Sequence, residues 1–196
     1  MKKLLDILNF QKLLKKYNGV YRDLSSIHNS KESDNDIEHS YRVAMLCWFI
    51  VEKYKLKLKI SKILKYALVH DLVEVYAGDV SIYKNTPKKV KSAKEHKSFQ
   101  KLQKQFPHLE DMWSTISKYE KRTDAESKFV YIIEKLEPIF VVILSEQDHW
   151  IKRNVSIDDF IDRKQSKIKD ISSFAQMFNK ETMDYLQKNK HKFFKK

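Results

Sequence analysis

Hydrophobic and polar residues recur with the period of an α-helix along most of the chain. Leucines at helical spacing predict a first helix over residues 3–17. A capping box, Asn35-x-x-Glu38, predicts the start of a second helix that runs to about residue 54. Five side chains are expected on the apolar face of this second helix: Ile37, Tyr41, Ala44, Met45 and Trp48.

A third helix is predicted from about Ser61 to Gly78, because apolar residues return there every three or four positions. A second capping box, Thr123-x-x-Glu126, predicts the start of a long apolar helix. The remaining helices are predicted over residues 88–105, 109–119, 123–144, 156–177 and 181–190.

The composition agrees with a helical protein of one domain. The 196 residues include only two glycines and three prolines, so few turns are encoded that require either residue. The single cysteine, Cys47, lies in an apolar run and is expected in the core, which excludes a disulfide framework. No apolar stretch is long enough to span a membrane, and the amphipathic start is not a signal peptide. A cytoplasmic location is therefore expected.

The formal charge of +13 raises the question of a nucleic-acid partner. Only five of the 39 basic residues are arginine, and the lysines are scattered without an arginine-rich stripe or an aromatic stacking module. A nucleic-acid partner is therefore disfavoured. Lysine-coated helices instead favour solubility and the attraction of anionic substrates.

His70 and Asp71 are neighbours within the third predicted helix, and His39 lies near the first turn of the second. Adjacent helical residues point about 100° apart, so this pair can hold one object only from two edges of a shared pocket. Imidazole nitrogen together with carboxylate oxygen suits a divalent metal ion. Glu74 follows one turn later on the same helical face and adds a further carboxylate.

Four sequence blocks resemble, in order, those of the HD-domain metal-dependent phosphohydrolases, particularly the branch that contains the 5′-deoxynucleotidases. The blocks are FQKLLKKYNGVYR, ESDNDIEHSYRVAML, LVHDLVEVYAGD and ESKFVYIIEKLEP. The resemblance implies an all-α fold, a single HD-domain helical bundle over residues 1–196. Its metal-site core is expected at about residues 20–145, and additional C-terminal helices at about residues 156–192.

The same resemblance implies one divalent metal ion, with Mn, Co, Fe, Ni, Zn and Mg as candidates. Its expected ligands are His39, His70, Asp71 and Glu134. Glu134 stands where relatives commonly have Asp, which is the main departure from the family pattern. Its carboxylate lies one methylene further from the backbone, so the ion could shift, bind more weakly or be lost. The other histidines match no ligand spacing and are expected at the surface or in caps, which favours one ion over two: His28, His96, His108, His149 and His191.

The resemblance also implies roles for residues around the ion. Glu74 matches the catalytic glutamate of the family's HDxxE motif and is the acid/base candidate. Asp79 matches the aspartate of the family's GD motif and is expected to position water or bind a sugar hydroxyl. Arg22 matches an arginine that contacts phosphate in the deoxynucleotidase branch, and a guanidinium suits phosphate. For Arg42, support of the site and pairing with Glu38 or another surface carboxylate are equal alternatives.

The predicted function is hydrolysis of a nucleoside 5′-monophosphate, most of all a 2′-deoxynucleotide, to nucleoside and phosphate. One alternative is a phosphatase for another small phosphate ester. A second is a degenerate HD domain that binds a nucleotide or a protein partner without catalysis. A guanosine-tetraphosphate hydrolase is less favoured, because that branch carries HDxxED and Val75 follows Glu74 here. The expected partner is a small phosphorylated substrate. A homodimer is one possible oligomeric state, which the sequence does not decide.

Overall fold

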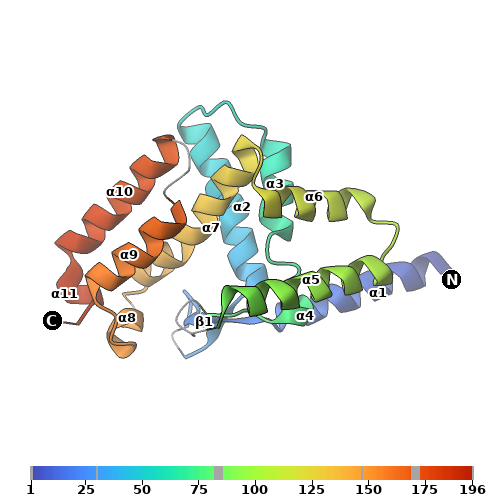
Figure 1. The fold of residues 1–196 in the computed structure, drawn as a ribbon, viewed down its shortest axis with the longest axis horizontal. Coiled ribbons are helices and arrows are strands. Elements are labelled where there is room, and N and C mark those ends of the chain that lie inside the picture. Colours follow the sequence, from blue (N-terminus) through green and yellow to red (C-terminus); the bar gives the residue numbers. More distant parts are fainter. Residues whose placement is uncertain (1, 30, 82–85, 147, 169–172, 196) are drawn as a thin grey trace.

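A computed structural model describes residues 2–29, 31–81, 86–146, 148–168 and 173–195 and shows an almost entirely helical fold (Figure 1). The first part of the chain forms α1 (Lys2–Asn18), β1 (Tyr21–Ser25), β2 (Ser33–Asn35), α2 (Asp36–Lys53), α3 (Ile60–Val69) and α4 (Glu74–Ala77). The second part forms α5 (Lys88–Gln105), α6 (Glu110–Lys121), α7 (Ala125–Leu144), α8 (His149–Lys152), α9 (Ile157–Ile168), α10 (Ser173–Lys188) and α11 (Lys190–Phe193). The two short strands pair antiparallel. The predicted all-α fold is confirmed.

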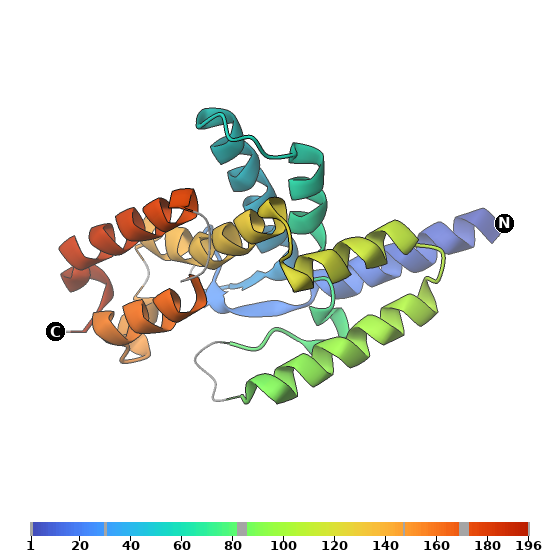
Figure 2. The ribbon, with the colours of Figure 1, turned by 45° about the horizontal axis from the view of Figure 1, so that its top comes forward.

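Helix α7 lies at the centre of the packing. Its residues Val130 and Ile133 pack with α2 and α3 in one core cluster. Leu136 and Ile139 pack with the C-terminal helices in a second cluster, which includes Trp150. In Figures 1 and 2, α7 crosses α2 in the middle of the molecule, and the C-terminal helices lie on the opposite side from α1 and α5. Helix α7 therefore joins the N-terminal and C-terminal parts of the chain.

The start of α2 is confirmed, but its buried face differs from the predicted one. Asn35 is the N-cap, and its side-chain oxygen accepts hydrogen bonds from the backbone N–H groups of Ile37 and Glu38, both at 3.0 Å. The buried side chains on α2 include Val43, Ala44, Cys47, Ile50 and Val51. Tyr41, Met45 and Trp48 are exposed, so their expected place in the core was wrong. This helix is apolar on more than one side, and periodicity alone does not choose between the sides.

The predicted third helix is divided in two. Helix α3 ends at Val69, and residues 70–73 form turns in which backbone N–H groups bond three residues back, as from Glu74 to Asp71 at 2.8 Å. The short helix α4 then ends at Ala77, and its C-cap Gly78 has a φ of 75°, which suits a residue without a Cβ. His70 and Asp71 consequently lie in a turn rather than on one regular helix.

The remaining helices also start or end near, but not always at, the predicted residues. Asp124 caps α7 by accepting a hydrogen bond from the backbone N–H of Ser127, at 2.7 Å, so the capping box predicted at Thr123 was wrong by one residue. The helix predicted over 156–177 corresponds to α9 and the beginning of α10, and residues 169–172 lie outside the described part. Among the described residues, no helix combines the length and apolar character needed to cross a membrane.

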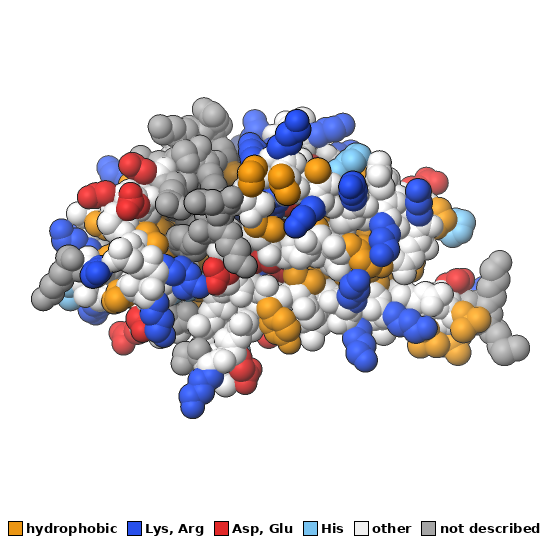
Figure 3. Space-filling view, turned by 60° about the horizontal axis from the view of Figure 1, so that its bottom comes forward, with side chains coloured by type: hydrophobic (Ala, Val, Ile, Leu, Met, Phe, Trp, Pro, Cys, Tyr) orange, Lys and Arg blue, Asp and Glu red, His pale blue; other side chains and the backbone are white. Residues whose placement is uncertain are grey.

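Basic side chains are spread over the surface. Figure 3 shows Lys and Arg side chains dispersed over one face, separated by apolar and uncharged groups. Seven lysines lie on α5, where they occupy half of the exposed positions. This distribution on the visible face is that of a solvated lysine-rich surface rather than of a continuous stripe.

Substitution of Asp124 should reveal how its carboxylate stabilises α7. Besides capping the helix, the carboxylate accepts a hydrogen bond from the Tyr66 hydroxyl at 2.7 Å and pairs with Lys62 at 2.9 Å. Burial would raise the pKa of Asp124, but the hydrogen bonds from Lys62 and Ser127 lower it from 3.8 to about 2. We expect Asp124→Ala to lower the free energy of unfolding by about 1 kcal/mol at neutral pH, as measured by urea denaturation.

Asp124→Asn is the matched control, because asparagine caps a helix as well as aspartate but carries no charge. A folded-state pKa below the unfolded one means that the charge stabilises the fold above pH 3.8, and that this contribution disappears as the pH falls toward about 2. The stability difference between the parent and Asp124→Asn should therefore shrink over that interval. A difference that stays constant would contradict the role of the charge.

Candidate metal centre and active site

The structure brings His39, His70 and Asp71 together from α2 and the turn after α3. One donor atom from each of the three side chains lies within 4.8 Å of the others. Asp71 Oδ2 is 3.2 Å from His70 Nε2 and 3.9 Å from His39 Nε2. Two imidazole nitrogens and a carboxylate oxygen around one point form a donor set that suits a divalent first-row metal ion.

The hydrogen bonds of the two histidines orient both Nε2 atoms toward Asp71. His39 Nδ1 donates to Glu137 Oε2 at 2.6 Å, and His70 Nδ1 donates to the carbonyl oxygen of Ala67 at 2.8 Å. Both Nε2 atoms are buried and have no hydrogen-bond partner among the described residues. A hydrogen bond at one ring nitrogen fixes the tautomer and leaves the other nitrogen free to coordinate a cation.

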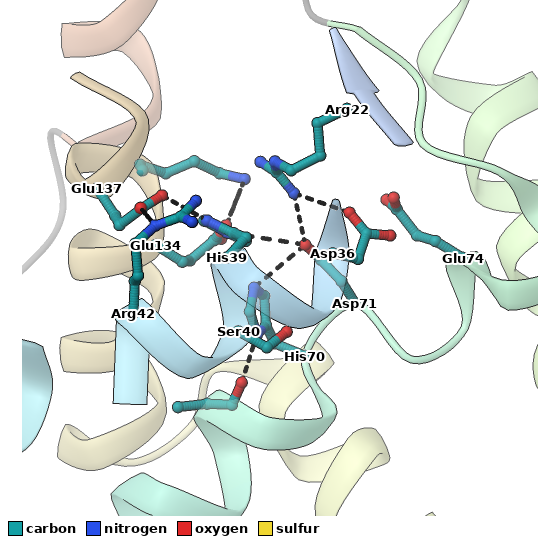
Figure 4. A network of polar contacts seen from close by, with 12 residues as sticks. Arg22, Asp36, His39, Ser40, Arg42, His70, Asp71, Glu74, Glu134 and Glu137 are labelled. Carbon is teal, nitrogen blue, oxygen red and sulfur yellow. Dashed lines mark hydrogen bonds and ion pairs between the residues drawn. The ribbon is translucent and has the colours of Figure 1, made fainter. Parts of the chain in front are cut away.

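Glu137 and Arg42 support His39 from outside the donor cluster (Figure 4). Arg42 donates to Glu137 Oε1 and, at 2.6 Å, to Asp34 Oδ2, and both carboxylates are buried. The more exposed Glu38 lies 3.8 Å from Arg42. Of the two alternatives for Arg42, its contacts therefore favour support of the site, with Glu38 as an additional, weaker partner.

The charges around the cluster shift the pKa values in opposite directions. Burial would raise the pKa of Glu137, but His39 and Arg42 lower it to about 2, so this group is a carboxylate. Burial lowers the pKa of His39. Burial would also lower the pKa of His70, but the adjacent Asp71 carboxylate raises it to about 9. The Asp71 carboxylate, 3.2 Å from His70 Nε2, therefore favours the protonated form of His70.

Arg22 reaches the centre from β1. Its Nη1 atom donates to Asp71 Oδ2 and to Asp36 Oδ1, in each case at 3.1 Å. Asp36 is the first residue of α2, and its second carboxylate oxygen is buried without a hydrogen-bond partner among the described residues. The structure thus places the predicted Arg22 beside the predicted Asp71, and it adds Asp36, which the sequence analysis missed.

Glu74 and Asp79 line the same cavity of about 130 Å³ as Arg22 and Asp71. Glu74 is buried, and Figure 4 shows its carboxylate facing that of Asp36. Burial raises the pKa of Glu74 well above the usual range, Asp71 raises it further, and Lys91 opposes both. Glu74 can therefore hold a proton at neutral pH, as a general acid must.

Glu134 also lines this cavity from α7, but it does not belong to the three-residue donor cluster. One of its oxygens accepts a hydrogen bond from the Tyr119 hydroxyl at 3.1 Å, and Lys135 Nζ lies 3.0 Å from its carboxylate. Burial would raise the pKa of Glu134, but Lys135 and His70 lower it. Glu134 is thus a buried carboxylate beside the cluster, with two partners of its own.

Among the described residues, Asp36, Asp71 and Glu74 form a second group with close donor atoms. The guanidinium of Arg22 bridges two of these carboxylates and already supplies positive charge there. The remaining histidines lie outside both groups. His149 was expected at the surface or in a cap, but it is buried at the start of α8, where Arg153 contacts it at 3.0 Å.

Comparison with known proteins finds a matching family model and several similar proteins. A family model described as HD domain matches residues 15–176. The human 5′-deoxynucleotidase HDDC2 is 25% identical over 163 residues, covering 82% of this chain and 78% of the relative. The Xenopus laevis 5′-deoxynucleotidase HDDC2 is 27% identical over 168 residues, covering 83% and 80%. The 5′-deoxynucleotidase hdd1 of Schizosaccharomyces pombe is 26% identical over 143 residues, covering 70% and 71%.

Two solved structures share the fold. A predicted metal-dependent phosphohydrolase from Magnetospirillum magnetotacticum MS-1 has a TM-score of 0.80 at 22% identity, and the similarity covers 98% of this chain and 96% of that one. A conserved hypothetical protein from Pyrococcus furiosus has a TM-score of 0.62 at 19% identity, covering 92% and 99%. The similarity thus extends over the C-terminal helices as well as the helices around the cluster.

The contacts of Glu137 predict a large effect of its substitution on stability. Glu137→Gln removes one of the two buried carboxylates that pair with Arg42, and it places an NH2 donor opposite either Arg42 or His39, which are both donors. Because this substitution breaks a buried charge pair and puts two donors face to face, we expect the free energy of unfolding to fall by about 3 kcal/mol in urea denaturation. Glu38→Gln is the control, since Glu38 faces the same arginine with a side chain that is 44% exposed. Equal effects of the two substitutions would contradict the special position of Glu137.

Proposed function

Because the chain belongs to the HD domain family, we propose that it is a metal-dependent phosphohydrolase acting on nucleoside 5′-monophosphates, with a preference for 2′-deoxynucleotides. The observation that carries this proposal is the cluster of His39, His70 and Asp71. Its Asp71 lines a cavity together with Arg22 and Glu74. The relatives named 5′-deoxynucleotidase support the substrate class. The products would be a nucleoside and inorganic phosphate.

The proposed cofactor is one divalent metal ion, with Mn, Co, Fe, Ni, Zn and Mg as candidates. The two unpartnered Nε2 atoms and Asp71 would hold it, and Glu134 is the proposed fourth ligand. When bound, such an ion supplies Lewis-acid stabilisation of phosphoryl oxygens and orients the reacting partners. We propose one ion rather than two, because Arg22 already compensates the second group of carboxylates.

Three side chains are proposed to act on the substrate. Arg22 would bind the phosphate, since its guanidinium lies at the cluster and offers several donors to phosphate oxygens. Glu74 would transfer a proton to the leaving oxygen, which its raised pKa favours. Asp79, on the same cavity wall, would contact a sugar hydroxyl or position water.

A second candidate function is binding of a nucleotide or protein without hydrolysis. The contacts of Glu134 favour it, because Tyr119 and Lys135 already engage the carboxylate that would complete a four-ligand site. The donor atoms of the other three residues argue against it. The metal content of the purified protein and its turnover together decide between the two functions.

The remaining features of this proposal are also predictions. A single HD domain is supported by α7, which contributes to two core clusters. The proposed partner is a small phosphorylated substrate, and a nucleic-acid partner stays disfavoured. A homodimer stays a prediction that analytical ultracentrifugation tests, and a cytoplasmic location stays a prediction that cell fractionation tests.

Substitution of His70 should abolish metal binding. His70→Ala removes one of three clustered donors, and we expect stoichiometric metal uptake to be lost in elemental analysis and in titration. Since the pKa of His70 is raised to about 9, metal binding by the parent near pH 7 should also release a proton. Calorimetry in buffers of different ionisation enthalpy measures that release.

His96→Ala is the control for this experiment, because His96 is exposed on α5 and its ring contacts the side chain of Gln100. Unchanged metal stoichiometry in His70→Ala would exclude a metal site formed by His39, His70 and Asp71. Full metal retention in Glu134→Gln would instead remove Glu134 from the ligand set and leave the three-residue centre in place.

The substrate proposal predicts phosphate release from nucleoside monophosphates, faster with deoxyribose than with ribose. Matched ribo- and deoxyribonucleoside 5′-monophosphates would be compared with Mn²⁺, Co²⁺ or Mg²⁺, using the parent and Arg22→Ala. Loss of a charge-assisted contact to phosphate should lower kcat/KM by about tenfold or more in the variant. Equal rates on both sugars would refute the deoxy preference alone, whereas no release from any monophosphate despite bound metal would refute the hydrolase.

A further inference from the structure

The two carboxylate oxygens of Glu74 have different surroundings. Oε1 lies 3.3 Å from Lys91 Nζ, which reaches it from α5. Oε2 is buried and has no hydrogen-bond partner among the described residues. Lys91 lines the same cavity as Arg22 and Asp71, so the contact lies within the candidate active site. Lys91 therefore binds one oxygen of Glu74, and the other oxygen has no hydrogen-bond partner among the described residues.

Lys91 is itself held in place by its helix. Glu95, one turn further along α5, lies 3.5 Å from Lys91 Nζ. Ser98 donates to the carbonyl oxygen of Val73, immediately before α4, and the fully buried Leu102 lies one turn beyond Ser98. Lys91, Glu95, Ser98 and Leu102 follow one another at the three- and four-residue spacing of a single helix face. Helix α5 thus packs on α4 (Figure 1). This packing directs Lys91 at Glu74.

We propose that Lys91 is a positioning residue for Glu74, which fixes the carboxylate so that Oε2 faces the reacting groups. This role rests on the proposed function, in which Glu74 transfers a proton. Contact with substrate phosphate is the other role open to a lysine in this cavity. Lys91 Nζ lies 3.3 Å from Glu74 and 3.5 Å from Glu95, and these contacts favour orientation of Glu74 over contact with phosphate.

The two roles predict different kinetics. A group that orients the proton donor affects the chemical step, whereas a phosphate contact affects binding of the substrate. We expect Lys91→Met, which keeps most of the unbranched side chain but removes the charged Nζ, to lower kcat by about tenfold or more with little change in KM. Lys91→Arg, which keeps the charge, should recover part of kcat. Lys94→Met, at an exposed position on the same helix, is the matched control and should behave as the parent.

A double-mutant cycle with Glu74→Gln tests whether Lys91 acts through Glu74. In the Glu74→Gln background, Lys91→Met should change kcat by less than about twofold, because the group that it orients has gone. A tenfold loss that persists in this background would overturn the proposal, and so would a rise in KM without a fall in kcat. Glu95→Gln should also lower kcat, by a smaller factor than Lys91→Met does.

A measurement that needs no turnover separates this proposal from the proposed function. The side-chain carboxyl ¹³C resonance of Glu74, assigned by its loss in Glu74→Gln, should shift in Lys91→Met and stay in place in Lys94→Met. An unshifted resonance in Lys91→Met would overturn the positioning role. If the parent hydrolyses no monophosphate but the resonance shifts, the function as proposed fails while the contact between Lys91 and Glu74 stands.

Discussion

The pairing of buried charges where α7 crosses α2 is the constraint on which the candidate site depends. Glu137 is almost completely buried and accepts hydrogen bonds from both His39 and Arg42. Neither a carboxylate nor a guanidinium is stable in the protein interior without a partner. The two helices must therefore meet in the register that joins these groups, and this register also sets the direction of the His39 ring.

The cluster itself could be predicted because part of its sequence signal is local and the rest comes from the resemblance to a family. His70 and Asp71 are adjacent, Glu74 follows at once, and the ordered blocks of the HD family indicated which distant histidine belongs with them. The low glycine and proline content similarly sufficed to predict a helical fold, which the structure confirms. Apart from the assignment of His39, these features depend on neighbours along the chain, which a single sequence displays.

Other parts of the site depend on contacts between distant segments. Asp36 resembles any acidic residue in the first turn of a helix, and only the position of β1 places Arg22 against it. Lys91 is one of many lysines on α5, and only the packing of α5 on α4 brings it to Glu74. The exposed face of α2 was mistaken for the buried one for a related reason. Its pattern is apolar on more than one side, and the burial is decided by α3 and α7.

The position of α7 in two core clusters has a consequence for local unfolding of the protein. Its first half packs with α2 and α3, and its second half packs with Trp150, Phe160 and Leu186. A helix that both clusters share couples their local unfolding into one cooperative event. Amide hydrogens of α2 beside His39 should then exchange at the same slow rate as those of the C-terminal helices packed on α7. The C-terminal helices, which contribute no donor atom to the three-residue cluster, would in this way govern how often the cluster comes apart.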